Sequence, residues 1–224
     1  LQVEADGRVA GTAPYEPGFY RRLLVNSPYM DFLKAHVKDL FNCVPVDGLF
    51  FDIVQELDDS SIHSRRGMID KGMDPADALQ RQAYGQTVME AFRSDMSAFV
   101  RDLNPEATIF YNSGHIGPQH RTTSETYSHF ELESLPSGGW GYVHFPMAVR
   151  YARTLGQDCM GMTGKFHTSW GDFHSFKNPE ALQYECFQML AHGAKCSVGD
   201  QLHPEGEICE TTYDLIGSVY SEVA

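Results

Sequence analysis

Carboxylates in two apolar segments of the sequence are the first candidates for chemistry. Asp52 directly follows the apolar residues 49–51, and Glu131 and Glu133 alternate with apolar residues in the segment 128–134 (SHFELES). A charge beside buried apolar side chains is costly unless it is paired. Such an acid therefore either has a structural role, as a cap or an ion-pair partner, or takes part in a reaction.

The segment 128–134 places three polar side chains on one face if it is a strand. His129, Glu131 and Glu133 are spaced two residues apart, and alternate residues of a strand point to the same side. Two carboxylates at this spacing lie ~7 Å apart along the strand, with Glu133 nearer its end. We expect one of the two glutamates to be a structural acid bonded to His129 or to a tyrosine.

Asp52 together with Glu131 or Glu133 forms the pair that cleavage of a glycosidic bond requires. One carboxylate attacks the anomeric carbon or activates water, and the other protonates the leaving group. The residues alone leave open which acid does which, and they leave the stereochemical outcome open as well. Carboxylates ~5–5.5 Å apart favour retention, and a separation of ~6.5–9.5 Å favours inversion.

Polar or aromatic residues near the ends of the other predicted strands are candidates for substrate binding. The two tryptophans lie in glycine-flanked segments, and an indole face suits the C–H face of a sugar. The alternative is that either indole only plugs the mouth of the fold. The candidates are Asn112, His129, Trp140, His167, Trp170 and Asp200.

Five short apolar runs predict the strands that position these residues. The runs cover 46–54, 108–112, 128–134, 159–167 and 195–201, and we expect the strands to be buried on both faces. Prolines that suit the first position of a helix predict intervening helices, and a last helix is predicted over 212–223. The predicted helix starts are Pro28, Pro75, Pro146 and Pro179.

Strands that alternate with helices indicate an α/β fold with a parallel sheet. The predicted fold class is a (β/α) TIM-type barrel, with residues 1–224 as one catalytic domain. Five strands fall short of the eight of a complete barrel, so we expect an incomplete barrel that holds the C-terminal strands. An open sheet is the alternative. Residues 114–127 are predicted to be a long loop, and Leu1 is not expected to begin the natural protein.

Charge and cysteine content exclude several classes of function. The formal net charge is −13 and no long Lys/Arg cluster occurs, so nucleic acid and anionic membranes are unlikely partners. A neutral small molecule suits the charge better. The 5 cysteines form no C-x-x-C motif, which predicts free thiols in the cytoplasm. Because zinc-protease, P-loop and dinucleotide-binding motifs are absent from the sequence, neither a metal nor a cofactor is predicted.

Four stretches together resemble a known family. Pro45–Val54, Ser128–Tyr142, Gly164–Lys177 and Ala191–Pro204 are similar to the α-L-fucosidases of glycoside hydrolase family 151. That group overlaps the "hypothetical glycosyl hydrolase 6" domain, which is often linked to a β-galactosidase-type trimerisation domain. The resemblance runs from about Asn26 to the end of the sequence.

The resemblance implies a retaining α-L-fucosidase on a (β/α)8 barrel, with a carbohydrate substrate and a homo-oligomeric assembly. It implies that Asp52 is the nucleophile, and it leaves Glu133 as acid/base with Glu131 as its rival. The segment 55–66 departs from the family because it lacks cysteines there, and the first three strands of the family barrel are missing. Two alternatives stay open: a β-galactosidase- or arabinosidase-like hydrolase, and a non-catalytic carbohydrate-binding or assembly fragment.

Overall fold

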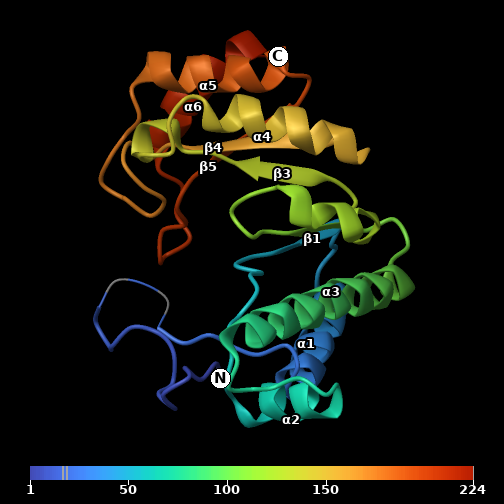
Figure 1. Ribbon diagram of the computed structural model, residues 1–224. Coiled ribbons are helices and arrows are strands. Elements are labelled where there is room, and N and C mark those ends of the chain that lie inside the picture. Colours follow the sequence, from blue (N-terminus) through green and yellow to red (C-terminus); the bar gives the residue numbers. More distant parts are fainter. Residues whose placement is uncertain (17, 19, 224) are drawn as a thin grey trace. The chain divides into compact units, whose positions relative to one another are not determined.

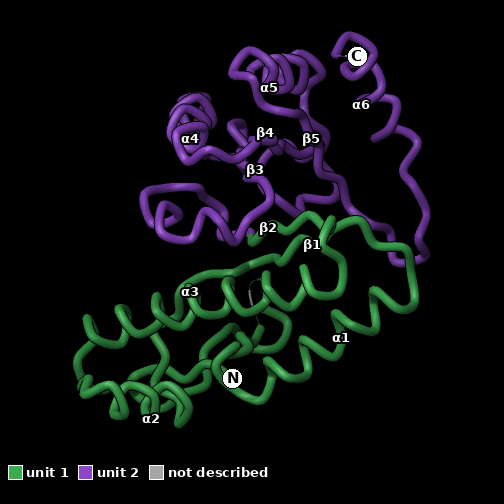
Figure 2. Tube along the Cα trace, turned by 90° about the vertical axis from the view of Figure 1, so that its right-hand side faces the viewer, with its two compact units in different colours: residues 1–111 green, residues 112–224 purple. Residues whose placement is uncertain are grey.

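The computed structural model describes all residues except 17, 19 and 224. The chain divides into two compact units, residues 1–111 and 112–224, which are coloured separately in Figure 2. The elements of unit 1 are α1 (Tyr29–Cys43), β1 (Gly48–Phe51), α2 (Ile62–Asp70), α3 (Ala78–Leu103) and β2 (Thr108–Tyr111). All five predicted strands form, and those in each unit pair in parallel (Figure 1).

The described residues of unit 2 form the other three strands, four short 3-10 helices and three α-helices. Its helices α4 and α5 pack against the three-stranded sheet, and α6 packs on α5 (Figure 1). The strands are β3 (Phe130–Glu133), β4 (Cys159–Gly164) and β5 (Lys195–Gly199). The α-helices are α4 (His144–Ala152), α5 (Pro179–Ala191) and α6 (Glu210–Val223). The 3-10 helices are η1 (Pro118–Thr122), η2 (Ser124–Thr126), η3 (Pro136–Gly138) and η4 (Arg153–Leu155).

The core of unit 1 lies between β1–β2 and the long helix α3. Phe51 stacks on Tyr111 with 5.1 Å between the ring centroids, and Phe92 of α3 meets Tyr111 edge-on. The strand β2 is buried after its first residue. The prediction that β1 is buried on both faces is wrong, because Phe50 is 44% exposed. In the described residues β1 pairs with β2 alone, so part of its surface stays uncovered.

The predicted helix starts are confirmed in part. Helix α5 begins at Pro179 as predicted, and Asn178 caps it by accepting hydrogen bonds from two main-chain N–H groups of the first turn. The start at Pro75 is wrong, since Asp77 caps α3 through Leu79 N and Gln80 N. Asp74 instead accepts from Ala76 N and closes a separate turn. Pro146 lies within α4, because that helix already begins at His144.

Two further segments differ from the sequence prediction. Residues 114–127, expected to be a loop, contain the 3-10 helices η1 and η2. Helix α2 was not predicted, because Ser64 and Met68 are its buried residues and its apolar side chains show no helical spacing. Within the described residues the strands form sheets of two and three strands, so closure into a barrel stays a prediction. None of the described helices has the length and apolar character needed to cross a bilayer.

Candidate active site

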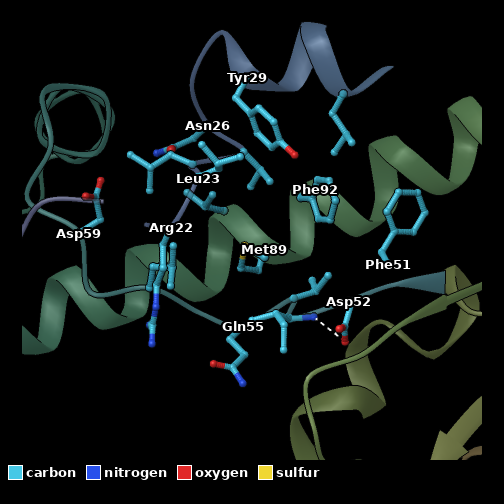
Figure 3. Close-up of a pocket in the computed structure, with 18 of the residues that line it drawn as sticks. Arg22, Leu23, Asn26, Tyr29, Phe51, Asp52, Gln55, Asp59, Met89 and Phe92 are labelled. Carbon is cyan, nitrogen blue, oxygen red and sulfur yellow. Dashed lines mark hydrogen bonds between the residues drawn. The ribbon is translucent and has the colours of Figure 1, made fainter. Parts of the chain in front are cut away.

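Asp52 lies immediately after β1, where the chain turns sharply. Its Oδ1 accepts a hydrogen bond from the N–H of Ile53 at 3.0 Å, drawn as a dashed line in Figure 3. Ile53 has a φ of 56°, in the left-handed region. That conformation is a genuine outlier for a β-branched residue and costs about 1–3 kcal/mol. Strain of this kind is concentrated at functional sites, which supports a role for the Asp52 turn beyond packing.

The segment after Asp52 is anchored to helix α3 by two ion pairs. Arg81 Nε lies 2.6 Å from Asp58 Oδ1, and Arg93 lies 3.5 Å from Glu56 Oε1. The helix also approaches closely at Gly85, where a Cβ atom would lie 2.4 Å from the Leu57 carbonyl oxygen. These contacts hold the segment after Asp52 against helix α3.

A pocket of about 420 Å³ opens beside Asp52 within unit 1. Its volume falls in the range of small-molecule sites, which hold a mainly apolar lining and a few polar groups. Figure 3 shows Asp52 and Gln55 on one side of the pocket, with Asn26 and Tyr29 on the other. Helix α3 contributes the apolar side chains of Met89 and Phe92. The arrangement places a carboxylate at the edge of a cavity that can take a monosaccharide-sized ligand.

The two glutamates of β3 have different partners. Glu131 Oε1 lies 2.9 Å from Nε2 of His129, whose Nδ1 in turn is 2.8 Å from the Ser128 hydroxyl. Glu133, the last residue of β3, accepts a hydrogen bond from Asn112 Nδ2 at 3.4 Å. The His129–Glu131 pair is the contact expected of a structural acid. Glu133 is therefore the better placed of the two for chemistry at the end of the strand.

Asn112 is buried and links Glu133 to the segment that follows β2. Its Oδ1 accepts a hydrogen bond from Gly114 N at 2.8 Å, while its Nδ2 reaches Glu133. Gly114 has a φ of 77°, and a Cβ atom there would lie 3.8 Å from Glu133 Oε2. The glycine thus lets the main chain turn close to the carboxylate. Of the sequence-predicted residues of unit 2, the structure brings Asn112 and Glu133 into direct contact.

The two tryptophans have different surroundings. Trp170 packs its six-membered ring over Gly199, where a Cβ atom would lie 2.4 Å away, and over Gly164. In the described part of the chain its buried Nε1 has no hydrogen-bond partner. Trp140 is 36% exposed between Gly139 and Gly141. Trp170 therefore agrees with the interpretation in which the indole only fills space in the fold. Trp140 agrees with the interpretation in which the indole face is open to a sugar.

The two remaining candidates lie on loops after strands of unit 2. His167 is exposed, and it lies outside its predicted strand because β4 ends at Gly164. Its main-chain N–H donates to the Ser175 hydroxyl. Asp200 follows β5 directly, and its Oδ1 accepts from Gln201 N at 2.7 Å.

One group of described residues brings metal-ligand atoms together. Side-chain atoms of His203, Glu205 and Glu207 lie within 4.8 Å of one another, and all three residues are exposed. Exposed acidic groups often gather in this way without an ion.

His144 was not among the sequence candidates, although it lies at the end of β3. Its Nδ1 is 3.1 Å from the hydroxyl of Ser134, the residue after Glu133. Burial, and secondly the nearby His115, lower the pKa of His144 below its usual value. The ring is therefore neutral near pH 7. The sequence pattern that could have identified His144 is a histidine four residues after the glycine-flanked Trp140, at the start of a helix.

Comparison with known proteins gives a match to a glycosidase. No family model matches the chain, and no curated protein matches it in sequence. Among solved structures, the chain is similar over 100% of its length to α-L-fucosidase isoenzyme 2 from Paenibacillus thiaminolyticus, with 39% identity and a TM-score of 0.92. The chain spans 34% of that fucosidase.

A more distant likeness concerns the fold. Bee venom hyaluronidase in complex with a hyaluronic acid tetramer matches 93% of this chain and 79% of its own, with 11% identity and a TM-score of 0.58. Identity this low shows similarity of fold alone. The chain therefore has an α/β fold of the glycoside hydrolase kind, and its structure matches one third of an α-L-fucosidase.

Proposed function

We propose that this chain is the part of a retaining exo-α-L-fucosidase that carries both catalytic carboxylates. The observation that carries the proposal is the match to an α-L-fucosidase over the whole chain at 39% identity. Two features of the structure support it independently. Asp52 lies on a strained turn beside a pocket, and Glu133 ends β3 with a buried amide holding it.

In the proposed mechanism Asp52 is the nucleophile and Glu133 is the acid/base. An Asp52 oxygen bonds to the anomeric carbon while the bond from that carbon to the leaving oxygen breaks, and Glu133 gives its proton to that oxygen. Water then attacks the anomeric carbon and releases Asp52, and Glu133 takes the proton from the water. Asn112 would orient Glu133 through the hydrogen bond between them. The hydrogen bond between His129 and Glu131 would have a structural role in the same strand.

The proposal is tested on the intact enzyme that contains this chain, with an aryl α-L-fucoside as substrate. Asp52→Asn should lower kcat by about 10⁶-fold, as removal of the nucleophile does in a serine protease. Glu133→Gln should be slow on poor leaving groups, and azide should rescue it on activated ones by taking the place of water. Glu131→Gln is the matched control on the same strand and should cost far less. Full activity in both Asp52→Asn and Asp52→Ala would overturn the mechanism.

The sugar itself is tested by a panel of aryl glycosides. We expect turnover of the α-L-fucoside and much slower turnover of β-galactosides and arabinosides. A clear preference for a β-galactoside or an arabinoside would show that the protein is a glycoside hydrolase with a substrate other than an α-L-fucoside. That residues 1–224 form one barrel domain, and that the enzyme is a homo-oligomer, are parts of the same proposal.

A further inference from the structure

Trp140 lies on a loop that gives its side chain little local support. Gly139 and Gly141, with φ of 97° and 77°, flank it in left-handed conformations that glycine adopts without steric cost. The loop is tied next to the indole but not through it: Gly141 N donates to the Pro136 carbonyl oxygen at 3.2 Å, His144 N donates to the Gly141 carbonyl oxygen at 3.2 Å, and the Tyr142 hydroxyl donates to Glu185. A Cβ atom at either glycine would have no neighbour within 4 Å. An indole in such a loop needs a contact from elsewhere to hold one orientation.

That contact comes from His144, the first residue of α4. The imidazole meets the Trp140 indole edge-on, with 4.9 Å between ring centroids and 87° between the planes. His115 lies near the same imidazole, at 5.8 Å between centroids. Edge-to-face packing is a favoured arrangement of two aromatic rings. His144 is thus the ring that fixes how the indole is turned.

His144 is in turn fixed by the sheet. Its Nδ1 is hydrogen-bonded to the hydroxyl of Ser134, which is 1% exposed. Ser134 N donates to the Met162 carbonyl oxygen of β4 at 2.8 Å, directly after the paired residues of β3 and β4. A continuous series of contacts therefore runs from the sheet through Ser134 and His144 to Trp140. It starts at the residue that follows Glu133.

We infer that His144 is a positioning residue that holds the Trp140 indole as a platform for the C–H face of a pyranose bound at the carboxyl end of β3. The inference rests on the proposed function, because it supplies that site with a sugar-binding surface. A side chain that is already ordered loses less entropy when the ligand binds. Loss of His144 should therefore weaken sugar binding and leave the chemical step nearly unchanged.

The first test reads the indole directly and needs no activity. The sequence has 2 tryptophans, so Trp170→Phe leaves Trp140 as the fluorophore. Adding His144→Ala should shift its emission to the red, raise quenching by acrylamide and lower its anisotropy. His144→Phe should restore most of the anisotropy, since it keeps a ring edge. If Trp170→Phe does not fold, the difference between matched Trp140 and Trp140→Phe proteins gives the same signal.

His192→Ala is the matched control for this test. Its ring also meets an aromatic side chain edge-on in unit 2, Phe145 at 6.1 Å, and its Nδ1 bonds to the Gln188 carbonyl oxygen. The His192→Ala variant should leave the emission of Trp140 unchanged, compared with a His144→Ala variant of the same thermal stability. Unchanged emission, quenching and anisotropy in His144→Ala would overturn the inference.

The second test measures the sugar, with L-fucose as the probe. In the intact enzyme His144→Ala should raise the Kd for L-fucose and the KM for the aryl α-L-fucoside by about tenfold, the effect of one side chain that must be ordered on binding, with kcat within about twofold. If the unsubstituted protein does not bind L-fucose, the proposed function fails, and the quenching test still decides whether His144 positions Trp140. If the unsubstituted protein and His144→Ala bind L-fucose with equal affinity, the positioning role fails and the proposed function stands.

Discussion

The segments that follow β1 and β4 both leave the carboxyl end of a strand, but they are anchored in different ways. After β1, Glu56 and Asp58 pair with two arginines of α3, and the side chains of both acids are 40% exposed. After β4, Lys165 and Lys177 bracket the loop and are 1% and 2% exposed. The two arginines are themselves buried, at 7% and 4% exposed, but their partner carboxylates reach solvent, whereas Lys177 and Glu185 are both buried. A pair that keeps one solvated member contributes less than a fully buried pair, whose remaining charge is strongly destabilising when its partner is removed. The Asp52 segment should therefore tolerate change that the β4 loop does not.

The loop after β4 is held by a fully buried polar network. Lys165 Nζ donates to the Phe173 carbonyl oxygen at 2.8 Å and lies 4.6 Å from the centre of the Phe176 ring. Lys177 Nζ bonds to Glu185 of α5, and to Thr163 Oγ1 at 2.7 Å. Burial lowers the pKa of Lys177, and Glu185 opposes that shift. The network ties β4, its loop and α5 into one piece.

The largest expected effect is from Lys177→Met. The substitution leaves the Glu185 carboxylate buried without its cation, which costs about 3–5 kcal/mol. Urea unfolding measures the loss. The double variant Lys177→Met with Glu185→Leu removes both charges and should recover most of the stability, because an apolar pair of similar volume is often tolerated. If the double variant is as unstable as the single one, the ion pair is not what holds this loop.

A smaller effect is expected from Gly85→Ala in the middle of α3. The new Cβ would lie 2.4 Å from the Leu57 carbonyl oxygen, so the segment after Asp52 must move. We expect a loss of about 1–3 kcal/mol in unfolding free energy from overpacking. The control is Gly217→Ala in α6, where a Cβ would have no neighbour within 4 Å. That change should stabilise by up to about 1 kcal/mol through helix propensity alone, so a gain at Gly85 would contradict the close approach.

Asp58→Asn tests the anchor whose carboxylate is 40% exposed and whose arginine is buried, and it should cost about 1 kcal/mol, because asparagine keeps a hydrogen-bond acceptor for Arg81. Arg81 keeps its hydrogen bonds to the Pro75 and Ala76 carbonyl oxygens at 3.0 Å each, so the helix start stays held. The effect should also shrink at high salt, which screens an exposed pair. A loss as large as that of Lys177→Met, measured in the same urea series, would remove the contrast between the two segments.

The smallest expected effect is a pH dependence from His144. Its pKa in the folded protein is lowered by burial, so below about pH 6.5 the unfolded chain binds a proton that the folded one resists. The contribution of His144 to the free energy of unfolding is fully present above that pH, and it is lost as the pH falls through the pKa of the folded protein. His144→Gln should make the acid-side loss of stability shallower. An unchanged pH profile of unfolding would show that the group is not desolvated as described.

The sequence predicted the elements better than their anchors. Apolar runs identified all five strands, because a strand inside an α/β fold must be apolar along most of its length. Helix α2 escaped prediction since it buries few apolar residues. Lys165 and Lys177 stand in the sequence as ordinary polar loop residues. Their burial depends on partners far along the chain, such as Glu185, which no local pattern reveals.

The same limit applies to the site. Alternation along a strand placed His129 and Glu131 on one face, and the structure joins them at 2.9 Å. The contact between Asn112 and Glu133 could be anticipated only as two polar residues at the ends of two predicted strands. His144 was missed because its role depends on the side chains of Trp140 and Ser134, which lie on different segments.

The most direct test of the proposed catalytic pair is the distance between the carboxylates of Asp52 and Glu133 in crystals of the intact enzyme with fucose bound. The account predicts a separation of about 5–5.5 Å, with the sugar between the two groups, as in retaining glycosidases. A separation of about 6.5 Å or more would contradict the retaining mechanism, and one well beyond about 9.5 Å would contradict the pair itself.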